Sequence, residues 1–199
     1  MHDWSDEQAL TYDQQWGALT FHTQIPSLAR VEAGNRIVEL GCGGGYLSLC
    51  LAKFAPEVKV LGLDPTAKMI KLAQNRRQEA GVDATHLTFL QVAAEELEVQ
   101  PDSLDLAIAA FSVHHWQEPK LGMSLVYQGL KPGGRIWLCE DLSVPLIDGV
   151  AVADMQVDTS LKAFEGLQAL LHRAGFIEIK HSVNSDFDGE FLIVEATKQ

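Results

Sequence analysis

The chain has 199 residues, a length that predicts one domain with a substantial core rather than two full enzyme domains. Its 15 basic and 27 acidic residues give a net charge of −12, which disfavours nucleic acid and anionic membrane surfaces as partners. The acidic N-terminus, the lack of a long apolar run and 3 cysteines without a C-x-x-C pair predict a cytoplasmic protein with no signal peptide, membrane span or metal site.

The first predicted element is an amphipathic helix over about residues 11–31, and an alternation of strands and helices follows it. The apolar runs that predict strands are residues 37–40, 58–63, 87–92, 104–113 and 135–140. The segments that predict helices between them are residues 46–54, 66–80 and 121–130. Thr66 is placed to cap the second of these helices, and Gly81 is placed to end it in the left-handed conformation. The alternation predicts βαβ crossovers and a parallel sheet that is covered on both faces.

The C-terminal part follows a different pattern. A helix is predicted over residues 160–174, and two further strands, residues 176–183 and 190–196, flank a turn-rich segment. These two strands predict an antiparallel hairpin at the end of the sheet. The predicted fold class is therefore α/β, in one domain, with a mostly parallel seven-stranded sheet that ends in an antiparallel hairpin.

The loop after the first predicted strand is rich in glycine. Residues 41–45 read Gly-Cys-Gly-Gly-Gly, and glycine lets a backbone turn tightly and approach a ligand. Asp64 follows the second predicted strand about 20 residues after Gly43, where an acid can accept bonds from both hydroxyls of a ribose. Position 46 is Tyr46 rather than glycine, so the spacing departs from the G-x-G-x-x-G fingerprint of dinucleotide-binding proteins.

An ordered set of segments resembles the class I S-adenosylmethionine-dependent methyltransferases. The resemblance is to the small, broad, methyltransferase type 11-like group that includes enzymes like those of ubiquinone and menaquinone biosynthesis. The segments that carry it are Ile37–Gly45, Leu61–Met69, Ala94–Leu97, Leu104–Leu106, Leu130–Gly134 and Ala174–Phe176. Each segment is common by itself, but the ordered set is specific. The resemblance implies a Rossmann-like three-layer sandwich and methyl transfer from S-adenosylmethionine to a small-molecule acceptor by in-line displacement.

The resemblance also implies which residues hold the cofactor. The methionine part is expected against Glu39 and the loop of Gly41, Cys42, Gly43 and Gly45, with Phe111 beneath it; the ribose is expected on Asp64, and the adenine beside Pro65 and Met69. Cys42 is expected to act mainly as a small filler of the loop. Glu39 is notable even without the resemblance, because a carboxylate inside an apolar strand is costly unless it is paired.

Adenine recognition departs from the family pattern. The family places an acidic residue just before the position of Ala94, where it contacts the adenine amino group, and this chain has Ala93 there. We expect Glu95 or the backbone of Ala94 to take over this contact.

The family resemblance divides the domain of residues 1–199 into three parts. Residues 1–34 are expected to form a helical lid, residues 35–140 the cofactor-binding core, and residues 141–199 the last helix and the hairpin. The segment from 141 to 159 is too short for a large insertion that covers the substrate. The aromatic side chains of the lid segment, which either cover the substrate or form the buried face of a helix, are Trp4, Tyr12, Trp16, Phe21 and His22.

The sequence offers candidates for the acceptor side but assigns no catalytic residue. His114 and His115 follow the fourth predicted strand, where substrates bind, and an imidazole can take a proton near neutral pH. Tyr12 of the lid segment is a third candidate. Each histidine can equally be a packing or turn-capping residue. Tyr127 and Lys131 have the spacing of a short-chain dehydrogenase pair, but Pro132 follows at once, so the pair stands at a helix end.

Two other functions stay open at this point. One is a non-catalytic module or partner subunit that binds S-adenosylmethionine. The other is an NAD(P)-dependent reductase, which the glycine spacing and the terminal hairpin disfavour. The cofactor motifs specify neither the methyl acceptor nor the oligomeric state.

Overall fold

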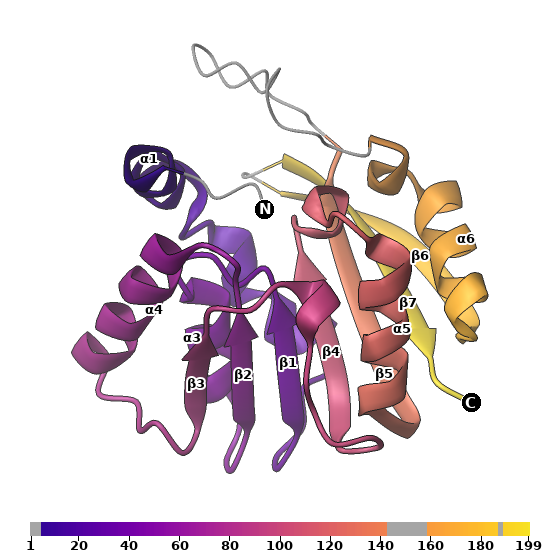
Figure 1. Ribbon diagram of the computed structural model, residues 1–199, viewed down its shortest axis with the longest axis horizontal. Coiled ribbons are helices and arrows are strands. Elements are labelled where there is room, and N and C mark those ends of the chain that lie inside the picture. The colour runs from indigo at the N-terminus through magenta and orange to yellow at the C-terminus, as the bar shows by residue number, and fades with distance from the viewer. Residues whose placement is uncertain (1–4, 143–158, 187–188) are drawn as a thin grey trace.

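Seven strands form one sheet in the computed structural model of the chain, which describes residues 5–142, 159–186 and 189–199 (Figure 1). The strand order is β3-β2-β1-β4-β5-β7-β6. The strands are β1 (Arg36–Leu40), β2 (Lys59–Leu63), β3 (Leu87–Leu90), β4 (Leu104–Ala110), β5 (Leu130–Asp141), β6 (Ile177–Asp186) and β7 (Gly189–Thr197). Strands β1 to β5 pair in parallel, and β7 lies antiparallel between β5 and β6. The predicted α/β fold, with a mostly parallel seven-stranded sheet and a terminal antiparallel hairpin, is confirmed.

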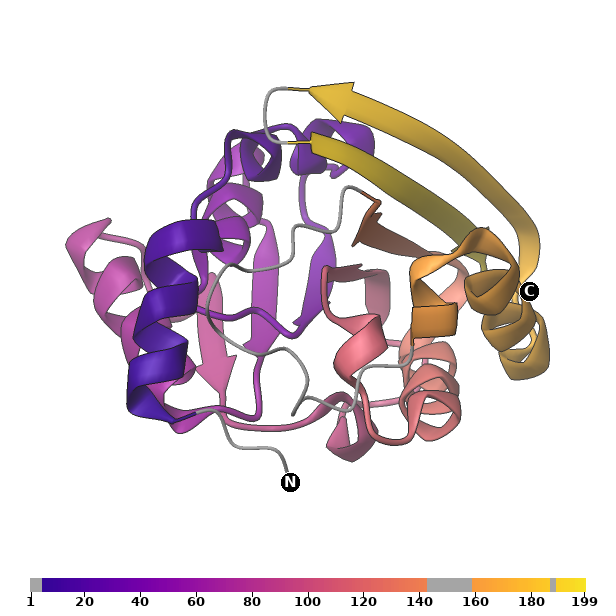
Figure 2. The same ribbon diagram turned by 90° about the horizontal axis from the view of Figure 1, so that it is seen from above.

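Helices cover both faces of the sheet. The α-helices are α1 (Asp6–Trp16), α2 (Ile25–Leu28), α3 (Tyr46–Phe54), α4 (Ala67–Glu79), α5 (Pro119–Gly129) and α6 (Phe164–Ala174). Short 3-10 helices are η1 (Thr20–Thr23), η2 (Ala94–Glu96), η3 (Val113–His115) and η5 (Thr159–Lys162). Residues of α2, α3 and α4 pack in the apolar cluster on one face, and residues of α5 and α6 pack in the cluster on the other (Figure 2). This is the three-layer sandwich that the family resemblance implied.

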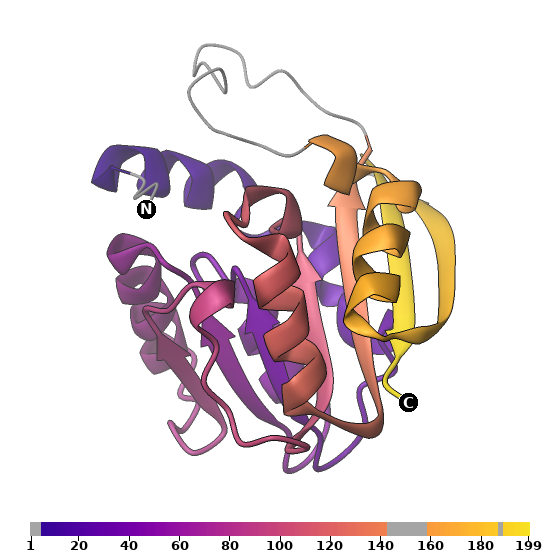
Figure 3. The same ribbon diagram turned by 45° about the vertical axis from the view of Figure 1, so that its right-hand side comes forward.

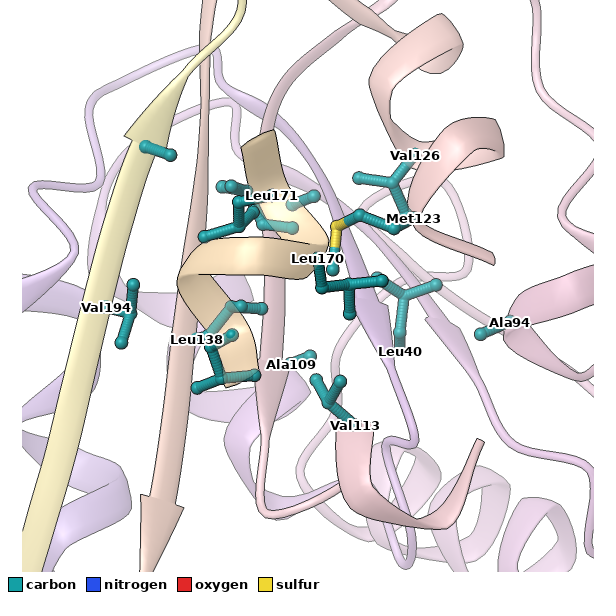
Figure 4. Packing of buried hydrophobic residues seen from close by; sticks show 14 of the residues in the cluster. Leu40, Ala94, Ala109, Val113, Met123, Val126, Leu138, Leu170, Leu171 and Val194 are labelled. Atoms are coloured by element: carbon teal, nitrogen blue, oxygen red, sulfur yellow. The ribbon is translucent and has the colours of Figure 1, made fainter. Parts of the chain in front are cut away.

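The central strand β4 is apolar from Leu106 to Ala110 because both of its faces are buried. Ala107 and Ala109 point into the cluster with α5 and α6, whereas Leu106 and Ile108 point into the cluster on the other face. Figure 4 shows the first cluster, in which Met123 of α5 lies close to α6 over the sheet. A strand that is buried on both faces has no solvent-facing positions, so it reads as a continuous apolar run.

The N-terminal segment is not the single helix predicted over residues 11–31. Helix α1 begins earlier, because Ser5 and Gln8 form a capping box at its start. It ends at Trp16, and Gly17, a poor helix former, follows as the C-cap. The chain then re-enters helical structure in η1 and in α2, where Pro26 occupies the first turn.

Element ends also shift where tertiary contacts decide them. The strand predicted over residues 104–113 ends at Ala110, because Phe111 has a φ of +57° and the chain turns there into η3. Strand β3 ends at Leu90, two residues before the predicted end, and β5 begins at Leu130, five residues before its predicted start. Gly81 has the expected positive φ, of +65°, beyond the end of α4.

Parts of the predictions fall on residues outside the described ranges. These are Trp4, most of the segment from 141 to 159, and the hairpin tip at 187–188. Within the described part of the chain, no helix is both long enough and apolar enough to cross a membrane.

Candidate active site

A cavity of about 480 Å³ opens at the carboxyl ends of the parallel strands. It lies where the strand order reverses, because β1 pairs with β2 on one side and with β4 on the other. The turns after these strands supply much of its wall, and α1 lies across this edge of the sheet (Figure 3). The lining residues are Tyr12, Gly41, Gly43, Asp64, Pro65, Thr66, Met69, Gln91, Val92, Ala93, Ala94, Glu95, Glu96, Phe111, Ser112, His115, Trp116, Gln117, Glu118 and Leu121. In parallel α/β sheets this edge is where ligands bind.

The glycine-rich loop passes close to the end of β4, and Gly41 is fixed by that approach. Its φ is +75°, and a Cβ atom there would lie 2.4 Å from the Cβ of Ser112. The Ser112 hydroxyl donates a hydrogen bond to the Leu40 carbonyl at 2.7 Å, which joins the ends of β1 and β4. A side chain at position 41 would therefore be strained and would also push the two strand ends apart.

Asp64 lies between the glycine loop and the start of α4. Its Oδ2 accepts the Gly43 N–H at 2.9 Å, and its Oδ1 accepts the Thr66 N–H at 2.8 Å. The carboxyl group of Asp64, and not the Thr66 side chain as predicted, makes the side-chain hydrogen bond at this helix start. Burial raises the pKa of Asp64, and the two amide contacts lower it part of the way back. The carboxylate faces the cavity with its orientation already fixed.

Glu39 lies behind the cavity wall rather than in it. The side chain is 3% exposed and accepts a short hydrogen bond from the Ser48 hydroxyl of α3. Burial, and after it the charge of Asp64, raises the pKa of Glu39 to about 8, while the Ser48 bond acts in the opposite direction. Burial and the same two carboxylates also raise the pKa of the Cys42 thiol, which stays protonated as a small loop residue.

Acidic side chains surround the far end of the cavity. The Glu95 carboxylate accepts the Glu118 N–H at 2.9 Å, and Glu96 accepts the Ala93 N–H at 3.4 Å. The first bond joins η2 to the start of α5, and the second caps the start of η2 itself. Together with Asp64, the three glutamates give this cavity four carboxylates, and no lysine or arginine is among its described lining residues. The cavity therefore favours cationic over anionic ligands.

An ion pair joins α1 to α4, and the same arginine also binds the glycine loop. Arg76 of α4 donates from Nη2 to Asp13 Oδ2 at 2.9 Å and from Nη1 to Asp13 Oδ1 at 3.2 Å, and Nη1 also donates to the Gly44 carbonyl. A Cβ at Gly44 would lie 1.9 Å from Asp13, so only glycine allows this approach. One helical position before Asp13, Tyr12 lines the cavity. Burial, followed by the charges of Asp64 and other nearby carboxylates, raises the pKa of Tyr12 to about 12.

The two candidate histidines occupy different places. His115 lines the cavity, whereas His114 is buried behind it, with Nδ1 2.5 Å from Glu140 Oε2 of β5. Burial lowers the pKa of each ring to about 3, so both imidazoles are neutral at pH 7. Phe111 packs with Phe21 and adds an aromatic wall on the same side.

Most of the site residues predicted from the sequence therefore lie around one cavity. Those that line it are Gly41, Gly43, Asp64, Pro65, Met69, Ala94, Glu95, Phe111, Tyr12 and His115; those that lie behind it are Glu39, Cys42, Gly45 and His114. Sequence reasoning missed Gln91 and Glu118 as lining residues, as well as Arg76 and Glu140. No local signal marked these four, and Gln91 fell inside the strand predicted over residues 87–92.

Comparisons with known proteins agree with this geometry. The family model described as "Methyltransferase domain" matches residues 37–134. A demethylmenaquinone methyltransferase of Clavibacter sepedonicus is 29% identical over 193 residues, which cover 85% of this chain and 74% of that protein. A ubiquinone biosynthesis O-methyltransferase of Rhizobium etli is 32% identical over 113 residues, or 57% of this chain and 44% of that protein. This chain thus spans less than half the length of the second relative.

A solved structure matches the fold over almost the whole chain. Phosphoethanolamine N-methyltransferase 2 of Haemonchus contortus, in complex with phosphomonomethylethanolamine and S-adenosylhomocysteine, superposes with a TM-score of 0.77. The match covers 98% of this chain and 58% of that chain at 19% sequence identity. At this identity the likeness concerns the fold alone.

Proposed function

Because this chain belongs to the class I S-adenosylmethionine-dependent methyltransferases, in the ubiquinone/menaquinone-biosynthesis-like group, we propose that it methylates a small-molecule acceptor by in-line displacement. S-adenosylmethionine is its cofactor, and when bound it supplies an electrophilic methyl group on a sulfonium. One observation carries the proposal: the glycine-rich loop and the buried carboxylate of Asp64 line the same cavity at the reversal of strand order.

The residues around the cavity fit this cofactor. Asp64 has its orientation fixed by two backbone amides and would accept hydrogen bonds from the ribose hydroxyls. Gly41 and Gly43 leave room for the methionine part beside the loop, and Pro65 and Met69 supply apolar surface for the adenine. The cavity volume lies within the range of about 300–1,000 Å³ that is usual for small-molecule sites.

The other proposed contacts act from the edges of this space. Position 93 is alanine where the family has an acidic residue, so the backbone of Ala94 or the Glu95 side chain would accept a hydrogen bond from the adenine amino group. Phe111 would pack against the methionine part. Glu39 lies behind the cavity wall and accepts a hydrogen bond from Ser48 of α3. Through this bond it would hold the start of α3, and with it the loop that contains Cys42 and Gly45, in place.

The charge of the cavity separates this cofactor from a nicotinamide dinucleotide. NAD(P) carries at least two negative charges on its phosphates. In this cavity they would face four carboxylates, and no lysine or arginine is among the described lining residues to offset the repulsion. S-adenosylmethionine brings a sulfonium and an ammonium, whose positive charges match the carboxylates. The same charges favour a neutral or cationic acceptor over an anionic one.

The acceptor side lies between α1 and η3. We infer that residues 1–34 act as a lid, residues 35–140 as the cofactor-binding core, and residues 141–199 as the part that completes the sheet. The lowered pKa of His115 makes its neutral ring a weak base, so the ring would orient an acceptor by a hydrogen bond rather than take its proton. Tyr12 stays protonated because its pKa is raised, so its hydroxyl would also act by hydrogen bonding. Holding the acceptor about 3–3.5 Å from the methyl group would supply much of the rate acceleration.

A binding experiment tests the cofactor site. The variant Asp64→Asn keeps the shape of the side chain but removes the charge, and loss of charged hydrogen bonds costs about 1.5–3 kcal/mol, or roughly 10- to 150-fold in affinity. Calorimetric titration with S-adenosylhomocysteine measures this loss. The matched control is Asp83→Asn, because Asp83 also accepts a backbone N–H, from Thr85, but lies outside the cavity. Equal affinity of wild type and Asp64→Asn would refute the ribose assignment.

A transfer experiment tests the reaction itself. Purified protein is incubated with methyl-labelled S-adenosylmethionine and a panel of neutral, cationic and anionic small molecules, and labelled products are detected by mass spectrometry. We expect transfer to a neutral or cationic member. Binding of S-adenosylhomocysteine without transfer to the panel or to cell extract would instead identify a non-catalytic module.

A further inference from the structure

A buried carboxyl group lies directly behind the acceptor side of the cavity. Glu140, near the end of β5, is 0% exposed, and its Oε2 lies 2.5 Å from Nδ1 of His114. Its other oxygen, Oε1, has no hydrogen-bond partner among the residues that the structure describes. The register between β4 and β5, in which Ala110 pairs with Cys139, places Glu140 beside the turn that leads into η3. A buried carboxyl group of this kind is costly, and its one side-chain bond is directed at the candidate site.

His114 is linked to the cavity through the neighbouring ring of His115. The rings of His114 and His115 pack against each other, with centroids 4.0 Å apart and planes tilted by 45°. His115 lines the cavity, whereas His114 and Glu140 do not. The hydrogen bond of Glu140 therefore reaches a ligand in the cavity through the two rings.

The charges around the pair determine where its shared proton lies. Burial raises the pKa of Glu140 to about 8, while Lys162 of η5 and the backbone N–H groups of His114 and Val113 act in the opposite direction and Asp141 adds to the rise. Burial lowers the pKa of His114 to about 3, Lys162 lowers it further, and Asp141 opposes this.

Two titratable groups of the cavity wall, His115 and Tyr12, also interact with this cluster. His114 and Lys162 contribute to the lowered pKa of His115, and Glu140 to the raised pKa of Tyr12. At pH 7 the carboxyl group is thus protonated, so that its O–H donates to Nδ1 and the ring of His114 carries its own proton on Nε2. Ionisation of the carboxyl group would reverse this arrangement, because a carboxylate needs a proton on Nδ1.

We propose that Glu140 is a positioning residue of this site: it sets which ring nitrogen of His114 carries the proton and, through the packed rings, holds His115 at the cavity wall. The proposal rests on the proposed function in one respect, that the cavity is where the acceptor binds. A hydrogen-bond partner at one ring nitrogen commonly fixes the tautomer of a functional histidine. Glu140 would do this for His114, whose ring packs against the ring that faces the ligand.

Nuclear magnetic resonance of the histidine rings tests this directly. Protein with ¹⁵N-labelled histidine is titrated from pH 6 to 9.5 in the presence and absence of S-adenosylhomocysteine, and the ring signals are assigned from His114→Gln and His115→Gln. Wild type should show a single Nε2–H tautomer of His114 at pH 6.5. Both rings should then change together with a midpoint near 8, where Glu140 ionises.

Two substitutions separate positioning from packing. In Glu140→Gln the amide NH₂ can donate to Nδ1 at every pH, so the tautomer should be kept and the transition near pH 8 should disappear. In Glu140→Met the hydrogen bond is lost, so His114 should show both tautomers and the His115 signals should shift. The control Glu79→Gln, at an exposed position of α4, should behave as wild type.

Two results would overturn the proposal. One is a transition that persists in Glu140→Gln, and the other is His115 signals that match wild type in both Glu140 variants. If the histidines behave as expected but S-adenosylhomocysteine does not bind, the assignment of the cavity fails while the positioning by Glu140 stands.

Discussion

Replacing Asp13 by asparagine should release α1 from the rest of the molecule without unfolding the sheet. Ala9 is the only fully buried residue of α1, so apolar packing holds this helix weakly. The ion pair with Arg76 attaches this helix to α4, with nitrogen–oxygen distances of 2.9 and 3.2 Å.

The expected size of the effect follows from the burial of the pair. The side chains of Asp13 and Arg76 are 11% and 26% exposed. Breaking a fully buried pair costs about 3–5 kcal/mol and an exposed pair contributes about 0.2–1 kcal/mol, so an intermediate loss of about 2 kcal/mol is expected. That free energy corresponds to a roughly 30-fold change in the equilibrium between attached and detached α1.

Amide hydrogen exchange measures this local opening. The amides of α1 should exchange about 30-fold faster in Asp13→Asn, while amides of the central strands keep wild-type rates. The control is Asp6→Asn, which makes the same change of charge; its partner Lys68 lies 3.4 Å away and Asp6 is 81% exposed, so little change is expected. A uniform loss of protection over the whole sheet, or unchanged exchange in α1, would refute the reasoning.

Two further predictions concern the folded state. Gly41→Ala should lower the free energy of unfolding by about 2–5 kcal/mol in urea titrations, because the positive φ and the clash with Ser112 add up; Gly81→Ala, with a positive φ but open space, should lose only about 1–2 kcal/mol, and equal losses would rule out the clash. The pKa of Glu39 is raised to about 8 in the folded state, so the unfolded state loses its proton first and stability falls by about 1.4 kcal/mol per pH unit between about pH 4.5 and 8. Glu39→Gln, which still accepts the Ser48 hydrogen bond, should remove this part of the slope, and identical pH slopes in both proteins would disprove the assignment.

The fold was predictable because its signals are local. Strands that are buried on both faces leave apolar runs, and Gly81 and Gly175, with φ of +65° and +102°, end their helices as their positions in the sequence indicate. The end of β4 was not predictable in this way. Phe111 takes a positive φ while its N–H donates to the Cys139 carbonyl at 2.8 Å, a contact with another strand that no local pattern reveals.

The residues of the candidate site fall into the same two groups, those marked by a local sequence signal and those defined by contacts with distant parts of the chain. The glycine loop and Asp64 stand directly after strands, so their meeting at one edge of the sheet follows from the topology. Arg76 and Glu140 were missed because their roles depend on Asp13 and His114, which lie 63 and 26 positions away in the sequence. An arginine inside a helix and a glutamate at a strand end are ordinary features until the fold brings their partners to them.

The position of β7 also affects how the molecule is made. This strand lies between β5 and β6, so it closes one edge of β5 although it is synthesised about 50 residues later. Until residues 189–197 have left the ribosome, β5 presents unpaired backbone groups from Arg135 to Asp141 along that edge, where another chain can add a strand. The parallel half of the sheet can form during synthesis, but protection against aggregation at this edge waits for the last strand described.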